Sequence, residues 1–316
     1  VWGVQNWEEA EVIQAEMGKR ILRCSSKTTN VAVLGELGWW RMKTRREYLA
    51  LKYWINIVLM EDTRLVKQVY RHSKELCKQS LILKQRNESW VRGIYGLTEK
   101  YRIYELWEDE RLITEPPEFK YERTRENLKR YWKKKLCEIV HSREEDEWKR
   151  MMRLKPKLRT YVQIKDKLEL EEYLKSQNNK QGRYLLTNIR TGTNKLRIET
   201  GRFRKKNGNK EKAEKEEVKD RLCMVCMSGE VEDEKHFVLS CTAYQMFRNR
   251  LFDQIKEASS GKLRLENFNR EDQFEILMKG NKQIERKQFF EYVNNNNNNS
   301  NSNNSNSNET ISPCFL

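Results

Sequence analysis

Residues 44–60 read TRREYLALKYWINIVLM, a run that is dense in large apolar side chains. The apolar residues are too many for one face of a helix: Tyr48, Leu49, Leu51, Tyr53, Trp54, Ile55, Ile57 and Val58. A helix that is apolar nearly all round is buried on most sides. The run therefore predicts a helix that is buried within a hydrophobic core.

Helical patterns continue on both sides of this run. Residues 7–23 place Val12, Ile13, Met17 and Ile21 at three- and four-residue spacing, and a short apolar piece at 31–34 leads into a turn expected at 35–38. Only four prolines and 13 glycines interrupt the 316 residues, which favours long helices. Further helices are expected at 63–79, 88–106, 182–191, 243–257, 270–279 and 282–292, with an amphipathic segment at 165–176. The sequence predicts a mainly α fold.

The longest expected helix covers residues 121–154, between Pro116-Pro117 and Pro156. It is highly charged and carries one apolar stripe, formed by Leu128, Trp132, Leu136, Ile139 or Val140, Trp148 and Met152. The acid pairs Glu144-Glu145 and Glu171-Glu172 lie in such charged runs and are interpreted as solvated helix faces. All nine tryptophans fall within the first 148 residues, so the large core is expected in the N-terminal half.

The positive charge is concentrated in one part of the chain. The net charge is +16, and residues 151–210 alone hold 17 basic against five acidic residues. Such a surface attracts polyanions, because each cation placed on a phosphate releases counterions. Nucleic acid is the expected partner, RNA before DNA, and the alternative is a surface that is merely soluble and basic. No run of eighteen apolar residues is present, so no membrane partner is expected.

Residues 223–241 carry the one motif with recognisable chemistry, Cys223-x2-Cys226-x9-His236-x4-Cys241. Three thiolates and one imidazole fill the four positions of a structural Zn²⁺ site and leave none open for an activated water. The alternative, three free cysteines near the start of a helix, leaves the spacing unexplained. The seven cysteines of the chain, an odd number, favour a reducing, intracellular compartment over a disulfide scaffold.

Four acids between the two ligand pairs make the motif itself a poor contact for phosphate: Glu230, Glu232, Asp233 and Glu234. Nucleic-acid contacts are therefore expected from the basic residues around the motif, namely Arg159, Lys195, Arg197, Arg202, Arg204, Lys205, Lys206, Arg221, Arg248 and Arg250. The sequence has no Tyr-x-Asp-Asp, P-loop, Gly-x-Ser-x-Gly or His-Glu-x-x-His motif, so we assign no catalytic residue.

Four stretches, in order along the chain, carry a likeness to one family. They are Val1-Trp2-Gly3 with Trp7; Val33-Leu34-Gly35-Glu36-Leu37-Gly38 with Arg45-Arg46 and Tyr53-Trp54; Lys157-Leu158-Arg159-Thr160-Tyr161 with Leu185 to Arg190, Thr191-Gly192, Leu196, Ile198-Glu199 and Gly201-Arg202; and the Cys/His motif with Glu232-Asp233-Glu234, Phe237, Tyr244 and Arg248. Over roughly residues 1–255, the chain resembles the C-terminal region of reverse transcriptases from non-LTR (LINE-type) retrotransposons. Arg41 departs from the family pattern, in which a proline follows the Gly-Glu-Leu-Gly turn.

The resemblance implies a helical thumb and linker that grip an RNA template, and a zinc knuckle that assists RNA binding. It places the RNA-directed DNA polymerase in a parent domain in cis, and the whole in a cytoplasmic or nuclear ribonucleoprotein. The first residue is Val1 rather than Met, and we expect the chain to belong to a longer protein. Two alternatives stay open: a degenerate element remnant with a zinc-stapled helical fold and no activity, or a host DNA-binding regulator.

Six segments are expected on this basis. They are a helical thumb or post-palm region at 1–115, the long charged helix at 116–155, a basic linker at 156–222, the Cys3His zinc-knuckle region at 223–258, C-terminal helices at 259–293, and a disordered Asn/Ser tail at 294–316. The charged stretch 204–220 within the linker is expected to be a mobile connector or a solvated helix.

Overall fold

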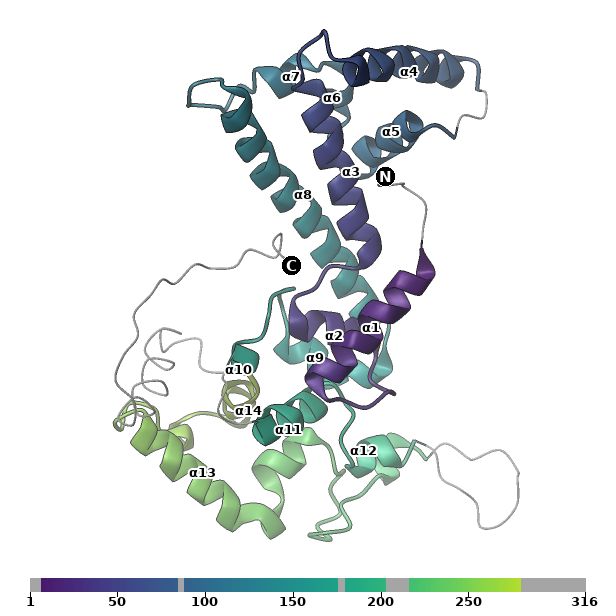
Figure 1. Cartoon of the computed structure of the whole chain (residues 1–316). Coiled ribbons are helices and arrows are strands. Elements are labelled where there is room, and N and C mark those ends of the chain that lie inside the picture. The colour runs from purple at the N-terminus through teal and green to yellow at the C-terminus, as the bar shows by residue number, and fades with distance from the viewer. Residues whose placement is uncertain (1–6, 85–87, 176–179, 203–215, 280–316) are drawn as a thin grey trace, which may run out of the picture.

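The computed structural model describes residues 7–84, 88–175, 180–202 and 216–279 (Figure 1). Regular structure in these ranges is helical, and strand pairing there is limited to the isolated bridges Leu37–Leu170 and Leu222–Val231. The mainly α fold is confirmed. The α-helices are α1 (Glu8–Leu22), α2 (Asn30–Leu37), α3 (Met42–Val58), α4 (Leu65–Ile82), α5 (Trp90–Lys100), α6 (Tyr104–Glu108), α7 (Arg111–Thr114), α8 (Arg125–Arg153), α9 (Arg159–Ile164), α10 (Glu172–Lys175), α11 (Lys180–Arg190), α12 (Arg197–Thr200), α13 (Gln245–Ala258) and α14 (Arg270–Lys279). Short single turns complete the order: η1 (Pro156–Leu158), η2 (Val218–Asp220), η3 (His236–Ser240), η4 (Thr242–Tyr244) and η5 (Leu265–Asn267).

Helix α3 is buried on most sides, as its apolar run predicts. Leu51 and Trp54 are fully buried, and the Trp54 indole donates a hydrogen bond to the Tyr70 hydroxyl, at 2.8 Å between Nε1 and Oη. Helix α3 packs along α8, with α5 against its other side (Figure 1). These helices share one hydrophobic core. Burial of the apolar side chains of α3 in this core stabilises the fold.

The apolar stripe of α8 faces this core. Leu128, Trp132, Leu136, Trp148 and Met152 are buried, and Val140 rather than Ile139 continues the stripe. The two buried indoles donate to backbone carbonyl groups, Trp132 to Ile113 and Trp148 to Val31, each at 2.9 Å. The core continues beyond α8 through Leu158, Tyr161 and Leu168, past the boundary expected at residue 156.

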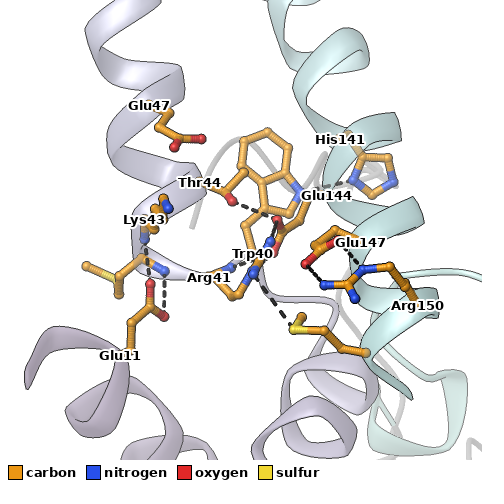
Figure 2. Close-up of polar contacts among 12 residues, drawn as sticks. Glu11, Trp40, Arg41, Lys43, Thr44, Glu47, His141, Glu144, Glu147 and Arg150 are labelled. Carbon is orange, nitrogen blue, oxygen red and sulfur yellow. Dashed lines mark hydrogen bonds and ion pairs between the residues drawn. The ribbon is translucent and has the colours of Figure 1, made fainter. Parts of the chain in front are cut away.

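The interpretation of Glu144 as part of a solvated face is wrong. Its side chain is 3% exposed and lies between α8 and the start of α3 (Figure 2). The Arg41 guanidinium donates to both carboxylate oxygens, at 2.8 Å from Nε and 2.7 Å from Nη2, and the Thr44 hydroxyl donates at 2.6 Å. Glu171 is likewise paired, with Lys165 at 2.5 Å and Arg190 at 2.9 Å. Partners more than a hundred residues away explain why Glu144 looked solvated in the sequence.

Carboxylates from two other helices cap the N-terminus of α3. The Glu11 carboxylate of α1 accepts the backbone N–H groups of Met42 and Lys43, at 3.1 and 2.7 Å, and Glu144 accepts that of Arg41 at 3.2 Å (Figure 2). The first backbone N–H groups of a helix lack partners within it, and a negative charge there is favourable. Arg41 has a φ of −58°, a value that proline also adopts.

Three expectations for individual elements need correction. The turn expected at 35–38 belongs to α2, which extends from Asn30 to Leu37; only Gly38 leaves the helix, with a φ of +63°. Gly35 lies within the helix, and the space beside it leaves no room for a side chain, because an added Cβ would lie 2.5 Å from the Tyr161 hydroxyl. The helix expected at 88–106 is divided into α5 and α6 at Arg102, whose φ is +56°. The segment expected at 165–176 forms only the short helix α10.

Helix α1 forms where the periodicity predicts it, but its large apolar residues do not face the core. Val12, Ile13, Met17 and Ile21 are each more than half exposed, whereas Ala10, Ala15, Gly18 and Leu22 are buried. Small residues on one face allow the backbone of α1 to approach α2 closely. The period of 3.6 therefore predicts the helix, and its largest side chains do not identify the buried face.

A smaller hydrophobic cluster holds the C-terminal helices together. It consists of Ile164, Leu239, Phe274 and Met278, with Leu186, Ile189, Val238, Phe252 and Leu277 packed against it. Arg190, which is fully buried, links this cluster to α2: it pairs with Glu36 at 2.9 Å and donates to the carbonyl oxygen of Met278. The helices expected at 182–191, 243–257 and 270–279 are confirmed as α11, α13 and α14. The helix expected at 282–292, the tail and residues 204–215 lie outside the described residues.

Candidate metal centre

The four residues of the Cys/His motif come together in the structure. The ligand atoms of Cys223, Cys226, His236 and Cys241 all lie within 4.8 Å of one another. The sulfurs of Cys223 and Cys241 are 4.0 Å apart, and that of Cys226 is 3.3 Å from His236 Nε2. A tetrahedral ion bound to sulfur at ~2.3 Å and to nitrogen at ~2.0 Å separates its ligand atoms by roughly 3.5–3.8 Å. The cluster therefore fits a single metal ion.

A tight turn presents the first two cysteines. Leu222 forms a β-bridge with Val231, and the Cys223 N–H donates to the Glu230 carbonyl group at 2.8 Å. Between the two bridged residues, the backbone reverses its direction through positive φ at Met227, 55°, and at Gly229, 76°. The latter position favours glycine. The reversal returns residues 230 and 231 to the side of 222 and 223, and the Cys226 sulfur lies within 4.8 Å of the Cys223 sulfur, as expected for a knuckle.

The second pair of ligands lies at the two ends of one helical turn. His236 begins η3, where its N–H donates to Asp233 Oδ1 at 2.8 Å, and Cys241 follows the turn with its N–H on the His236 carbonyl group at 2.7 Å. Arg248 of α13 donates to the carbonyl groups of Cys241 and Val238, at 2.7 and 2.9 Å. These bonds fix the backbone that carries both ligands.

A carboxylate orients the histidine ring. Glu230 Oε2 lies 2.6 Å from His236 Nδ1, so Nδ1–H donates to the carboxylate and Nε2 is turned towards the sulfurs. Metal-bound histidines commonly donate their second ring N–H to such a group, which fixes the tautomer and raises the basicity of the ligand nitrogen. The hydrogen bond between the Cys226 sulfur and the Ser228 hydroxyl lowers the pKa of this thiol to about 6. Burial raises the pKa of the Cys241 thiol to about 11.

Two of the four acids between the ligand pairs, Glu232 and Glu234, are buried and have structural contacts. Glu234 is 1% exposed and accepts bonds from Arg159, Thr160 and Asn194. Glu232 is buried too, and its carboxylate accepts the Arg197 N–H at 2.8 Å. These contacts tie the knuckle to α9 and α12, so the sequence Glu232-Asp233-Glu234 anchors the knuckle to the preceding helices.

Five of the ten basic residues expected to contact nucleic acid have partners within the chain, and two more are exposed. Arg159 pairs with Glu199 and Glu234, Arg197 with Glu216, and Arg202 with Glu199. Arg221 is 2% exposed and, like Arg248, donates to backbone carbonyl groups. The exposed members of the set are Lys195 and Arg250, and Arg204, Lys205 and Lys206 lie outside the described residues.

A basic groove that the sequence analysis missed lies between α3 and α8. It encloses about 390 Å³ and is lined by Lys52, Arg125, Lys129, Arg130 and Lys133, with Tyr53 and apolar side chains at its floor. None of the described residues that line it is acidic, although Lys129 also pairs with Glu126 outside the groove. Arg125, Lys129 and Lys133 recur every four residues, which puts them on one helix face. The net charge over residues 101–150 does not reveal this basic helix face, because acidic residues in the same range balance its positive charge.

No protein-family model, curated protein or solved structure matches this chain. Among the described residues, no helix has both the length and the apolar content needed to span a membrane. The chemistry of the candidate sites must therefore be argued from their own geometry.

Proposed function

We propose that this chain is a metal-stapled helical module that binds RNA. The observation that carries the proposal is the α3–α8 groove, which five cations line and no described acid lines. The groove is fixed in shape because both of its walls belong to the main hydrophobic core. A preformed row of cations on rigid helices suits a polyanion backbone, since little ordering is needed on binding.

The resemblance to non-LTR reverse transcriptases supports RNA as the nucleic acid. Under this proposal the chain supplies template-gripping surface to a polymerase domain in cis, and the described residues contribute no catalysis. A Tyr-x-Asp-Asp motif encoded upstream in the same frame would support this parentage. The same binding assay tests the alternative that the chain is a host DNA-binding regulator. A preference for one defined DNA duplex over RNA would favour that alternative.

We infer that the metal is Zn²⁺, held by Cys223, Cys226, His236 and Cys241. Three thiolates and one imidazole match the ligand preference of zinc, and four protein ligands leave no site for catalysis. The ion would stabilise the turn that joins α9, α12 and α13. Mass spectrometry of the native protein should find one zinc per chain, and Cys226→Ser should lower this content while Cys24→Ser leaves it unchanged. A metal-free native protein would contradict the assignment and support a decayed element.

The groove is tested by neutralising three of its cations together. In Lys52→Gln/Arg125→Gln/Lys133→Gln, the affinity for a short unstructured RNA should fall, and the slope of log K against log salt should decrease by roughly 2. The matched control is Lys27→Gln/Lys167→Gln/Lys262→Gln, three exposed residues elsewhere with the same change in net charge. Equal losses in the two variants would show that only the overall charge matters. No RNA binding at physiological salt would overturn the proposed function.

A further inference from the structure

A second hollow lies on α8 beside the basic groove. It encloses about 580 Å³, within the range of small-molecule sites, and three aromatic rings line it, from Phe119, Tyr121 and Tyr131. Arg130 lines both this hollow and the groove. The two features are therefore continuous across the surface of α8, whose position is seen in Figure 1.

The three rings contact one another in series, and the ring of Tyr121 at the end of the series is exposed to solvent. Phe119 contacts Tyr131 edge-on with 5.4 Å between ring centroids, and Tyr121 contacts Phe119 in the same way at 5.9 Å. Tyr131 in turn contacts Trp132, which is buried in the main core. Tyr121 is 76% exposed, an unusual setting for a large ring that a structural role would place inside.

The loop that carries Phe119 and Tyr121 is anchored to α8 at both of its ends. Lys135 pairs with Glu118 at 3.1 Å, and the Asn127 side chain donates to the Glu122 carbonyl group at 3.0 Å. The Thr124 hydroxyl caps α8 by accepting the Asn127 N–H at 3.3 Å. The bonds at Glu122 and Thr124 fix where the loop joins α8, whereas the exposed Lys135–Glu118 pair adds little. A loop that is joined in this way loses less conformational freedom on binding than a free segment.

We propose that this aromatic hollow receives an unpaired base of a single-stranded nucleic acid whose phosphates lie along the α3–α8 groove. The inference rests on the proposed function. Every base offers a π-face that stacks on an aromatic ring, and Arg130 stands where the ribose-phosphate would pass from groove to hollow. Arg130 and Lys134 outnumber the one lining acid, Glu138, while Lys135 is paired with Glu118. This balance suits an anionic ligand better than an apolar peptide.

Bases inside a duplex are already stacked on one another, so the hollow selects single strands. The test compares a short single-stranded RNA with an abasic strand of equal length and charge, and with its duplex. The unmodified protein should bind the normal strand roughly tenfold more tightly than the abasic strand, because the abasic strand lacks the base that would stack on the aromatic ring. Tyr121→Ala should remove this difference without changing the slope of log K against log salt, and Tyr121→Phe should retain it.

Each outcome separates the two proposals. Equal binding of normal and abasic strands, or preference for the duplex, overturns the base-binding hollow and leaves the groove untouched. Absence of binding to all three ligands overturns the proposed function and the hollow with it. Because Tyr121 is so exposed, its variants should keep the melting temperature of the parent. A variant that loses binding of the abasic strand as well would assign Tyr121 a structural role and also overturn the inference.

Discussion

At the scale of single residues, the contact between Glu144 and Arg41 shows how charge is used inside this protein. A buried carboxylate is unfavourable unless hydrogen bonds and an opposite charge replace its water. Glu144 has a bidentate guanidinium, a hydroxyl and a backbone N–H group. The hydrogen bond to Glu144 in turn raises the pKa of Arg41 above its ordinary value. The pair fixes the register between α3 and α8, and thereby the walls of the basic groove.

Neutralising Glu144 should destabilise the fold. Glu144→Gln keeps the shape of the side chain but leaves Arg41 with a weaker acceptor, and we expect a loss of about 2–3 kcal/mol in the free energy of unfolding. This is below the usual range for a broken buried pair, because Arg41 is a quarter exposed and water can reach it. Urea denaturation followed by circular dichroism measures the difference.

The matched control is Glu147→Gln, one turn further along α8. Glu147 also forms a bidentate contact with an arginine, Arg150, but that pair lies at the surface (Figure 2). Surface pairs contribute little, so the control should unfold at nearly the same urea concentration as the parent protein. Equal effects of the two substitutions would show that burial does not set the strength of the Glu144 contact.

At the scale of elements, the packing of α2 depends on the absence of a side chain at Gly35. An added Cβ would lie 2.5 Å from the Tyr161 hydroxyl and 2.6 Å from Cζ2 of Trp148, both in the core. Gly35→Ala should therefore cost about 1–3 kcal/mol through overpacking, although alanine is the better helix former. Chemical denaturation should show the midpoint moving to lower denaturant with an unchanged slope.

Gly96 of α5 provides the opposite case in the same protein. Its helical position is open, with nothing within 4 Å of an added Cβ, so Gly96→Ala should raise stability by up to about 1 kcal/mol. Changes of opposite sign in the free energy of unfolding at these two helical glycines would show that the space around the residue, rather than helix propensity, decides the effect of alanine. If both substitutions stabilise the protein, the close approach of α2 to Trp148 and Tyr161 is not rigid.

Elements could be predicted where the deciding information is local. The stripe of α8 identifies its buried face because the rest of that helix is charged, and the four metal ligands lie within one short motif. Information from distant segments was missing elsewhere. The sequence could not show that Glu144 meets Arg41, or that Lys52 and Arg125 flank one groove, because each pair is far apart along the chain. For α1, the sequence pattern also failed to indicate the buried face, because small residues rather than large ones form the contact with α2.

At the scale of the whole molecule, the two largest of the three hydrophobic clusters in the described residues differ greatly in size. The larger includes α3, α5 and α8 and ends at Leu168; the smaller joins α9, α11, η3, α13 and α14 through few side chains. Leu239 of the smaller cluster lies inside the turn that joins His236 to Cys241. Under the proposed zinc assignment, removal of the ion should therefore loosen the smaller cluster and leave the larger one intact.

Hydrogen exchange before and after treatment with a zinc chelator measures this difference. We expect faster exchange across residues 222–278 and unchanged exchange across residues 48–58. The reason is that the binding of structural zinc stabilises small domains by about 10–16 kcal/mol, far more than a hydrophobic cluster of this size contributes. The Glu36–Arg190 pair should hold α11 in place, since neither of its residues contacts the metal ligands. The chelator should have no further effect on Cys226→Ser, which lacks a ligand. Equal acceleration in both regions would mean that the two clusters form one cooperative unit that the metal stabilises as a whole.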